Sequence, residues 1–282
     1  MLTISVALVS EVDGHDPGDV ARVTAALQRQ AIRDFRLVWS VEATVDSFPT
    51  LEDVPLGYWP MLVRDDIGFP GAAGIHLDKD GQPFALITMS DSWSLTASHE
   101  LLEMLADPFG NRVVPGRSPK QDQGRVEFLL EVCDPSEAEQ FGYTVNDILV
   151  SDFYTPRFFD PIRVDGVRYS YTGAIRAPRT ILRGGYVSWH DPVSDHWWQQ
   201  TWFGGSKPKF RDLGVFDARA HGSVRAWIDS KTEHPGIDDG LDRSNETLQA
   251  AVVRGQATAQ SASAKARAWH DQVQDLQSRN GE

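Results

Sequence analysis

The sequence predicts an α+β fold, with a mixed sheet and one central helix in an N-terminal lobe and a β-rich C-terminal lobe. Three observations support this. Apolar runs of strand length, residues 2–10 and 58–63, lie on either side of a stretch with helical periodicity. A helix with clear start and stop signals spans 92–107. Over 184–204, aromatic and polar residues alternate as in a long β-ribbon.

The first helix and the strands around it follow from local signals. Asp16 supplies an N-cap and Pro17 occupies the first helical position, and apolar residues continue at helical spacing to about Phe35. The chain then returns as a strand over 35–45, rich in Val, Leu and Trp, before the strand at 58–63.

The remaining elements are shorter. Strands over 74–77 and 84–89 flank Asp-Lys-Asp-Gly, which is a hairpin signal. Residues 110–123 are polar and contain Pro and Gly, so we expect a loop. A second hairpin signal lies at 164–167, and 223–230 is a candidate helix.

These elements suggest three segments. Residues 1–160 form a domain around the central helix, and 161–244 form the β-rich lobe. Residues 245–282 are rich in Ala, Gln and Ser and poor in large apolar side chains, which predicts a helical or flexible tail. This tail is a candidate segment for binding a partner.

Composition limits the function. The 282 residues are 41% hydrophobic with nine Trp, which is typical of a globular protein. A formal net charge of −13 argues against nucleic acid or an anionic membrane as the main partner. One cysteine, Cys133, excludes an internal disulfide and is compatible with the cytosol. The N-terminus lacks the basic region of a signal peptide, and we expect a cytoplasmic protein.

The central helix carries the most informative motif. Ser92 or Ser94 can cap its start, and Pro108 ends it. His99 and Glu103 are four residues apart, so both project from one face. Glu100 lies beside them. An imidazole and two carboxylates in this spacing can bind a metal ion and supply a base.

This motif, H-E-x-x-E, resembles the H-E-x-x-H signature of the zincin metallopeptidases. The resemblance implies that His99 and Glu103 hold one zinc ion and that Glu100 is the general base. Glu103 replaces the usual second His, and a carboxylate binds zinc at much the same distance as an imidazole. With more carboxylates, another divalent ion is also open.

A second run, Arg125 to Pro135, offers the missing third ligand. In the gluzincin branch that ligand is a Glu downstream of the helix, with an Asp nearby, and Glu131 and Asp134 fit these roles. Asp107 is the alternative ligand, although a structural role suits its place at the helix end better. The H-E-x-x-E motif, Asp-Pro and later E-x-x-D also resemble the plant phosphate-induced (exordium-like) proteins and bacterial relatives.

The zincin resemblance implies further roles. A Tyr from the lower lobe would stabilise the oxyanion, with Tyr154 or Tyr143 as candidates. An edge strand before the helix, here 73–77, would pair with an extended peptide substrate. Cys133 has no His partner visible in the sequence, so we interpret it as a buried apolar residue.

Together these features predict a metal-dependent hydrolase that cleaves a peptide or related amide bond with metal-activated water. The alternative is a non-catalytic binding protein on the same scaffold, with a structural Zn²⁺ or Ca²⁺ ion or with none.

Overall fold

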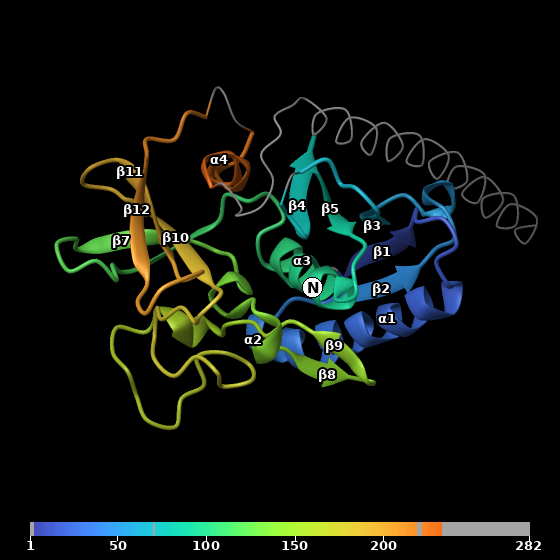
Figure 1. Ribbon diagram of the computed structural model, residues 1–282, viewed down its shortest axis with the longest axis horizontal. Helices are drawn as coiled ribbons and strands as arrows, with labels where there is room; N and C mark the ends of the chain where they lie inside the picture. The colour runs from blue at the N-terminus through green and yellow to red at the C-terminus, as the bar shows by residue number, and fades with distance from the viewer. Residues whose placement is uncertain (1–2, 70, 219–221, 233–282) are drawn as a thin grey trace, which may run out of the picture.

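The computed structural model describes residues 3–69, 71–218 and 222–232, and it confirms the α+β class (Figure 1). The predicted tail over 245–282 lies outside the described residues. In chain order, the named elements are β1 (Ile4–Ser10), α1 (Pro17–Arg29), a π-helix (Gln30–Phe35), α2 (Arg36–Trp39), β2 (Ala43–Ser47), β3 (Tyr58–Arg64), β4 (Gly74–Lys79), β5 (Gln82–Thr88), α3 (Trp93–Ala106), β6 (Val113–Arg117), β7 (Arg125–Leu129), β8 (Tyr143–Val145), β9 (Ile148–Val150), β10 (Tyr186–Asp191), β11 (His196–Thr201), β12 (Lys209–Gly214) and α4 (Val224–Lys231).

The first sheet has the strand order β2-β1-β3-β5-β4. Its strands are parallel except β4, which runs antiparallel to β5 through the predicted hairpin. Because side chains alternate along a strand, Val6 and Leu8 face the core shared with α1 and α3, whereas Ala7 and Val9 face the opposite side. Among the described residues β4 pairs with β5 alone, so the predicted edge strand lies at an edge.

The strand predicted over 35–45 is wrong in its first half. The helix continues through the π-helix and α2, and the strand β2 begins only at Ala43. The apolar run that suggested a strand instead serves helix packing: Phe35 is fully buried, and the Trp39 indole N–H donates to the Tyr154 carbonyl at 2.9 Å. Here tertiary contacts outweigh local strand propensity.

A buried carboxylate, Asp34, ties this helix to later parts of the chain. It accepts hydrogen bonds from Arg33, from Tyr143 at 2.9 Å and from Tyr171 at 2.6 Å. Burial alone would raise the pKa of Asp34, but the hydrogen bonds from Arg33, Tyr171 and Tyr143 outweigh it and lower the pKa.

Asp34→Asn should therefore destabilise the fold by about 1.5–3 kcal/mol near neutral pH, the usual worth of hydrogen bonds to a charged group. A lowered folded-state pKa means that this contribution is complete above the unfolded pKa of about 3.9 and is lost as pH falls further. Urea unfolding of both proteins should give equal differences at pH 7 and pH 5. A difference that already disappears between these values would mean a raised pKa and contradict the prediction.

The second sheet is antiparallel, with the order β12-β11-β10-β7-β6. The predicted ribbon over 184–204 is confirmed as β10 and β11, and the helix over 223–230 as α4. The loop predicted over 110–123 is wrong in part, because it contains β6, which pairs with β7. The hairpin predicted at 164–167 is a turn without strands.

The sheet pairing crosses the predicted segment boundary at residue 160. Strands β6 and β7 precede it, whereas β10 to β12 follow it. One cluster of buried apolar residues also extends from β1 and α3 to Phe128 on β7 and Trp189 on β10. The two sheets therefore share one hydrophobic core. Within the described ranges, no helix combines the length and apolar character needed to cross a membrane.

The predicted central helix is confirmed as α3, Trp93–Ala106. Ser92 is at the N-cap position, but it makes no side-chain capping bond, and the Ser94 hydroxyl instead donates to the Leu149 carbonyl at 2.9 Å. Leu101, Leu102 and Leu105 are buried on several sides of the helix, as expected of a helix inside the core. Its acidic side chains are therefore held in a buried environment.

Candidate metal centre

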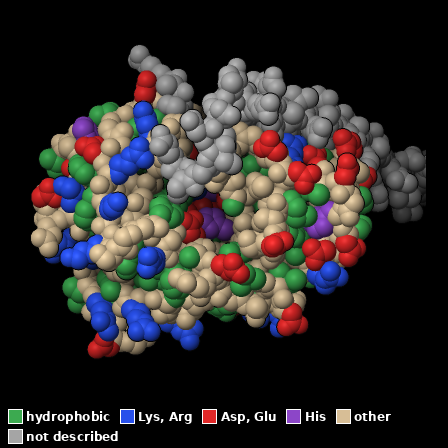
Figure 2. Space-filling view, viewed as in Figure 1, with side chains coloured by type: hydrophobic (Ala, Val, Ile, Leu, Met, Phe, Trp, Pro, Cys, Tyr) green, Lys and Arg blue, Asp and Glu red, His purple; other side chains and the backbone are tan. Residues whose placement is uncertain are grey.

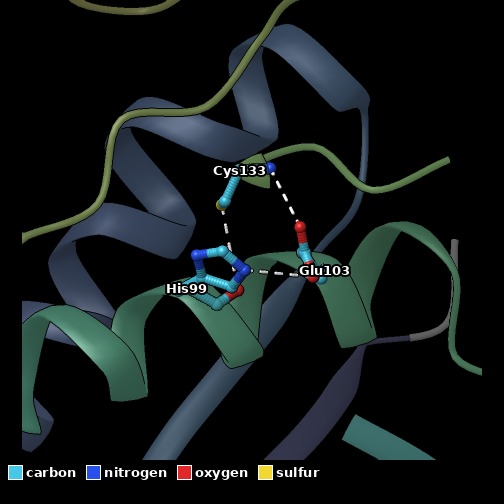
Figure 3. A group of neighbouring side chains, drawn as sticks. All are labelled: His99, Glu103 and Cys133. Carbon is cyan, nitrogen blue, oxygen red and sulfur yellow. Dashed lines mark hydrogen bonds and ion pairs between the residues drawn. The ribbon is translucent and has the colours of Figure 1, made fainter. Parts of the chain in front are cut away.

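His99 and Glu103 face each other from successive turns of α3, as their spacing predicts (Figure 3). The distance from His99 Nε2 to Glu103 Oε2 is 3.3 Å. Glu103 is completely buried, and the His99 side chain keeps 12% of its exposure. Solvent therefore reaches this pair at His99, whereas Glu103 lies deeper in the protein.

Glu103 also fixes the segment after β7. Its Oε1 accepts the backbone N–H groups of Cys133 at 3.1 Å and Asp134 at 3.3 Å. This holds Asp134 over α3, with Oδ1 at 3.2 Å from His99 Nε2. The Glu103 carboxylate thus positions Cys133 and Asp134 through Oε1, and its second oxygen, Oε2, faces His99.

His99 Nε2 lies at ligand-to-ligand separations of a metal ion from both Glu103 and Asp134. Ligands at the usual zinc distances of about 2.0–2.2 Å in a tetrahedron lie about 3.3–3.6 Å apart. The observed separations from His99 Nε2 are 3.3 and 3.2 Å. In the described residues, Glu103 Oε2 and Asp134 Oδ1 are buried without a hydrogen-bond partner. Buried carboxylate oxygens need a partner, and a cation among them would supply it.

Glu131 belongs to the same acidic cluster but has another partner. Its Oε2 lies 2.6 Å from Nη1 of Arg225, a residue of α4. Glu103, Glu131 and Asp134 place carboxylate oxygens within 4.8 Å of one another. Of the two predicted third ligands, Asp134 contacts His99, whereas Glu131 contacts the guanidinium.

Glu100, the predicted base, is buried on the side of α3 that meets β4. Its Oε2 lies 3.3 Å from Nδ1 of His76, a residue of β4 that the sequence reasoning assigned only to the edge strand. His76 Nδ1 is also 3.7 Å from Glu103 Oε2. His76 therefore orients Glu100 beside the candidate ligands.

Gly74 permits this close approach of β4 to α3. A Cβ atom there would lie 2.6 Å from Thr96 Cγ2 and 2.7 Å from Glu100 Oε1, which is closer than real contacts allow. Gly74→Ala should therefore displace Glu100; in a metal-dependent hydrolase with Glu100 as its base, this would lower turnover while the metal content stays at the level of the parent. Kinetics and metal analysis of the variant would check this. Gly124→Ala is the control, because a Cβ atom there meets nothing within 4 Å. Gly81→Ala is unsuitable, because the φ of +78° at this residue of the exposed hairpin turn would strain an alanine.

The electrostatics of the site favour cations. Burial alone would lower the pKa of His99, but Glu103 and Asp134 outweigh it and raise the pKa well above its usual value. Burial and the neighbouring Glu103 raise the pKa of Asp134 to about 6. The metal-free site therefore holds protons that a divalent ion would displace.

Of the other candidates, Tyr154 and Cys133 lie near the carboxylates of the site, whereas Tyr143 and Asp107 have partners elsewhere. Tyr154 is completely buried, and its hydroxyl has no hydrogen-bond partner among the described residues; burial and then Glu131 raise its pKa. The Tyr143 hydroxyl is bonded to Asp34, away from the metal-binding groups. Asp107 accepts the Arg112 backbone N–H at 2.7 Å, as expected of a structural residue. The buried Cys133 thiol lies 3.8 Å from the His99 carbonyl.

His76 and Arg225 are among the residues of the site that the sequence did not predict. His76 is the third residue of an apolar strand, and a buried polar residue in such a run is a signal that could have been used. Arg225 follows Asp134 by 91 residues and has no local signal at all.

Figure 2 shows a hollow between the two sheet regions, where a histidine and acidic side chains reach the surface. Comparisons with protein-family models, curated proteins and solved structures found no match for this chain.

Proposed function

We propose that this chain is a metal-dependent hydrolase of peptide or related amide bonds. The observation that carries the proposal is the position of His99 Nε2 at 3.3 Å from Glu103 Oε2 and 3.2 Å from Asp134 Oδ1, separations that suit pairs of ligands on one tetrahedral ion. Zinc is the expected ion for one imidazole and two carboxylates, and a cytoplasmic location belongs to the same proposal.

When bound, the ion would act as a Lewis acid that lowers the pKa of water and polarises a substrate carbonyl. The chain supplies the remaining chemistry. Glu100 takes a proton from the attacking water and passes it to the leaving nitrogen. His76 keeps the Glu100 carboxylate in place through the 3.3 Å contact. Among the described residues β4 is the edge strand of its sheet, and it contacts α3, so an extended peptide can add there as a further strand.

The test begins with metal analysis of the purified protein, for which we expect one zinc ion per chain, and with assays on a peptide library. Asp134→Asn should lose the ion, because a carboxylate ligand becomes a neutral amide. The matched variant Asp107→Asn changes a buried Asp at the end of the same helix. It should keep the ion, because the amide oxygen still accepts the Arg112 N–H.

The reverse pattern, with the ion kept in Asp134→Asn and lost in Asp107→Asn, would make Asp107 the ligand and contradict the proposed centre. A stoichiometric ion without hydrolysis of any peptide or amide would favour the alternative function, a binding protein with a structural ion.

A further inference from the structure

Arg225 enters the acidic cluster from α4 in a fixed position. Its backbone N–H donates to the Gly110 carbonyl at 3.0 Å, just beyond the end of α3. Gly110 has a φ of +60°, and a Cβ there would lie 2.7 Å from the Arg225 Cβ. Trp227 and Ile228 of α4 pack into a buried cluster with Leu129 of β7. The helix is therefore anchored to both parts of the site.

The guanidinium of Arg225 meets three carboxylates of the centre. Nη1 lies 2.6 Å from Glu131 Oε2, 3.3 Å from Asp134 Oδ2 and 3.6 Å from Glu103 Oε2. The remaining nitrogens contact Asp229 at 3.2 Å and the Tyr186 hydroxyl at 3.3 Å. Only 8% of the Arg225 side chain is exposed. The buried guanidinium therefore occupies a position between three carboxylates. Without it, these oxygens would bind a different cation.

Glu131, the carboxylate closest to Arg225 Nη1, also lies beside the buried His76. Glu131 Oε1 and His76 Nε2 have no hydrogen-bond partner among the described residues. Glu131 is 5% exposed and His76 is 1% exposed. His76 Nε2 lies 3.9 Å from Glu131 Oε2. The donors around the guanidinium thus include an imidazole nitrogen and several carboxylate oxygens, which is a ligand set for a divalent ion.

We propose that the centre is built for two cations: an exchangeable divalent ion on His99, Glu103 and Asp134, and the fixed guanidinium of Arg225 on Glu131. This inference rests on the proposed metal centre. It makes Glu131 a partner of Arg225 and not a ligand, and it makes Arg225 a positioning residue that bridges Glu131 and Asp134. It also predicts a latent second site, rich in carboxylate oxygen, that Arg225 closes.

The experiment measures ions bound per chain by equilibrium dialysis, with Zn²⁺ and Mn²⁺ in separate titrations. The parent should bind one ion. Arg225→Met has similar bulk without charge, and it should bind two. Arg225→Lys keeps a cation in the cluster and should bind one. The double variant with Arg225→Met and Glu131→Gln should also return to one, because the latent site loses its main carboxylate.

A purely stabilising role for Arg225 gives a different result. Arg225→Met would then lose stability without gaining an ion, and this outcome overturns the proposal. If Arg225→Met does not fold, Glu131→Gln alone decides: retention of one ion supports the proposal, and loss of that ion makes Glu131 a ligand and overturns it.

The outcomes also separate this inference from the proposed function. A parent that binds no ion contradicts the metal-dependent hydrolase. In that case, an ion bound by Arg225→Met still supports the latent site, and no ion in either protein overturns it.

Discussion

Glu103→Gln should remove stoichiometric metal from this protein. Glu103 Oε2 is the atom on which the site converges, at 3.3 Å from His99, 3.6 Å from Arg225 and 3.7 Å from His76. Gln preserves the volume and can still accept the Cys133 and Asp134 N–H groups through one oxygen. Its amide N–H₂ group then occupies the Oε2 position and faces other donors. At that position neither a metal ion nor the Arg225 guanidinium would find an acceptor.

The same substitution should destabilise the metal-free protein by about 3–5 kcal/mol, the usual cost of removing one partner of a buried ion pair. Metal content and urea unfolding in the presence of a chelator measure the two effects separately. Glu127→Gln is the control: Glu127 forms a part-exposed pair with His190, so its loss should cost less than about 1 kcal/mol and leave the ion in place. Full metal content in Glu103→Gln would locate the ion elsewhere.

Local sequence signals were enough to predict the end of α3, the β4–β5 turn and the shared face of His99 and Glu103. Pro108 ends α3, the Asp-Lys-Asp-Gly turn joins β4 to β5, and the spacing of His99 and Glu103 brings both to one face. The first half of the strand predicted over 35–45 is wrong because its apolar residues pack as a helix against parts of the chain that follow more than a hundred residues later. The loop predicted over 110–123 is wrong only where β6 takes its strand character from pairing with β7.

The candidate site likewise contains contacts that follow from local sequence and contacts that depend on tertiary structure. His99, Glu100 and Glu103 share one helix, and their proximity follows from the helical repeat. The family resemblance predicted Asp134 and Glu131 as candidate ligands. Their different partners depend on Arg225, whose position is set by the packing of α4. His76 meets Glu100 only because β4 adds to the sheet edge above α3. Contacts of this kind depend on the sheet order, which periodicity alone does not give.

Glu100→Gln should abolish most turnover while the protein folds and binds metal as the parent does. Glu100 is not among the three donors that converge on the proposed ion, and its Oε2 contacts His76 instead. Gln keeps the size and an acceptor oxygen for His76, so the packing against Gly74 and Thr96 is preserved. What it removes is the group that accepts a proton from the attacking water.

A positioned general base is worth about 10²–10⁴-fold, so kcat should fall by that factor, whereas the metal content of Glu100→Gln should match that of the parent. The variant should also retain an uncleaved peptide, which pull-down of a labelled library would detect. Glu127→Gln should leave hydrolysis unchanged. Undiminished hydrolysis by Glu100→Gln would contradict the role of Glu100. If the parent cleaves no peptide and the substitution alters only the contact with His76, the site instead supports a binding protein, in which Glu100 serves to hold β4 against α3.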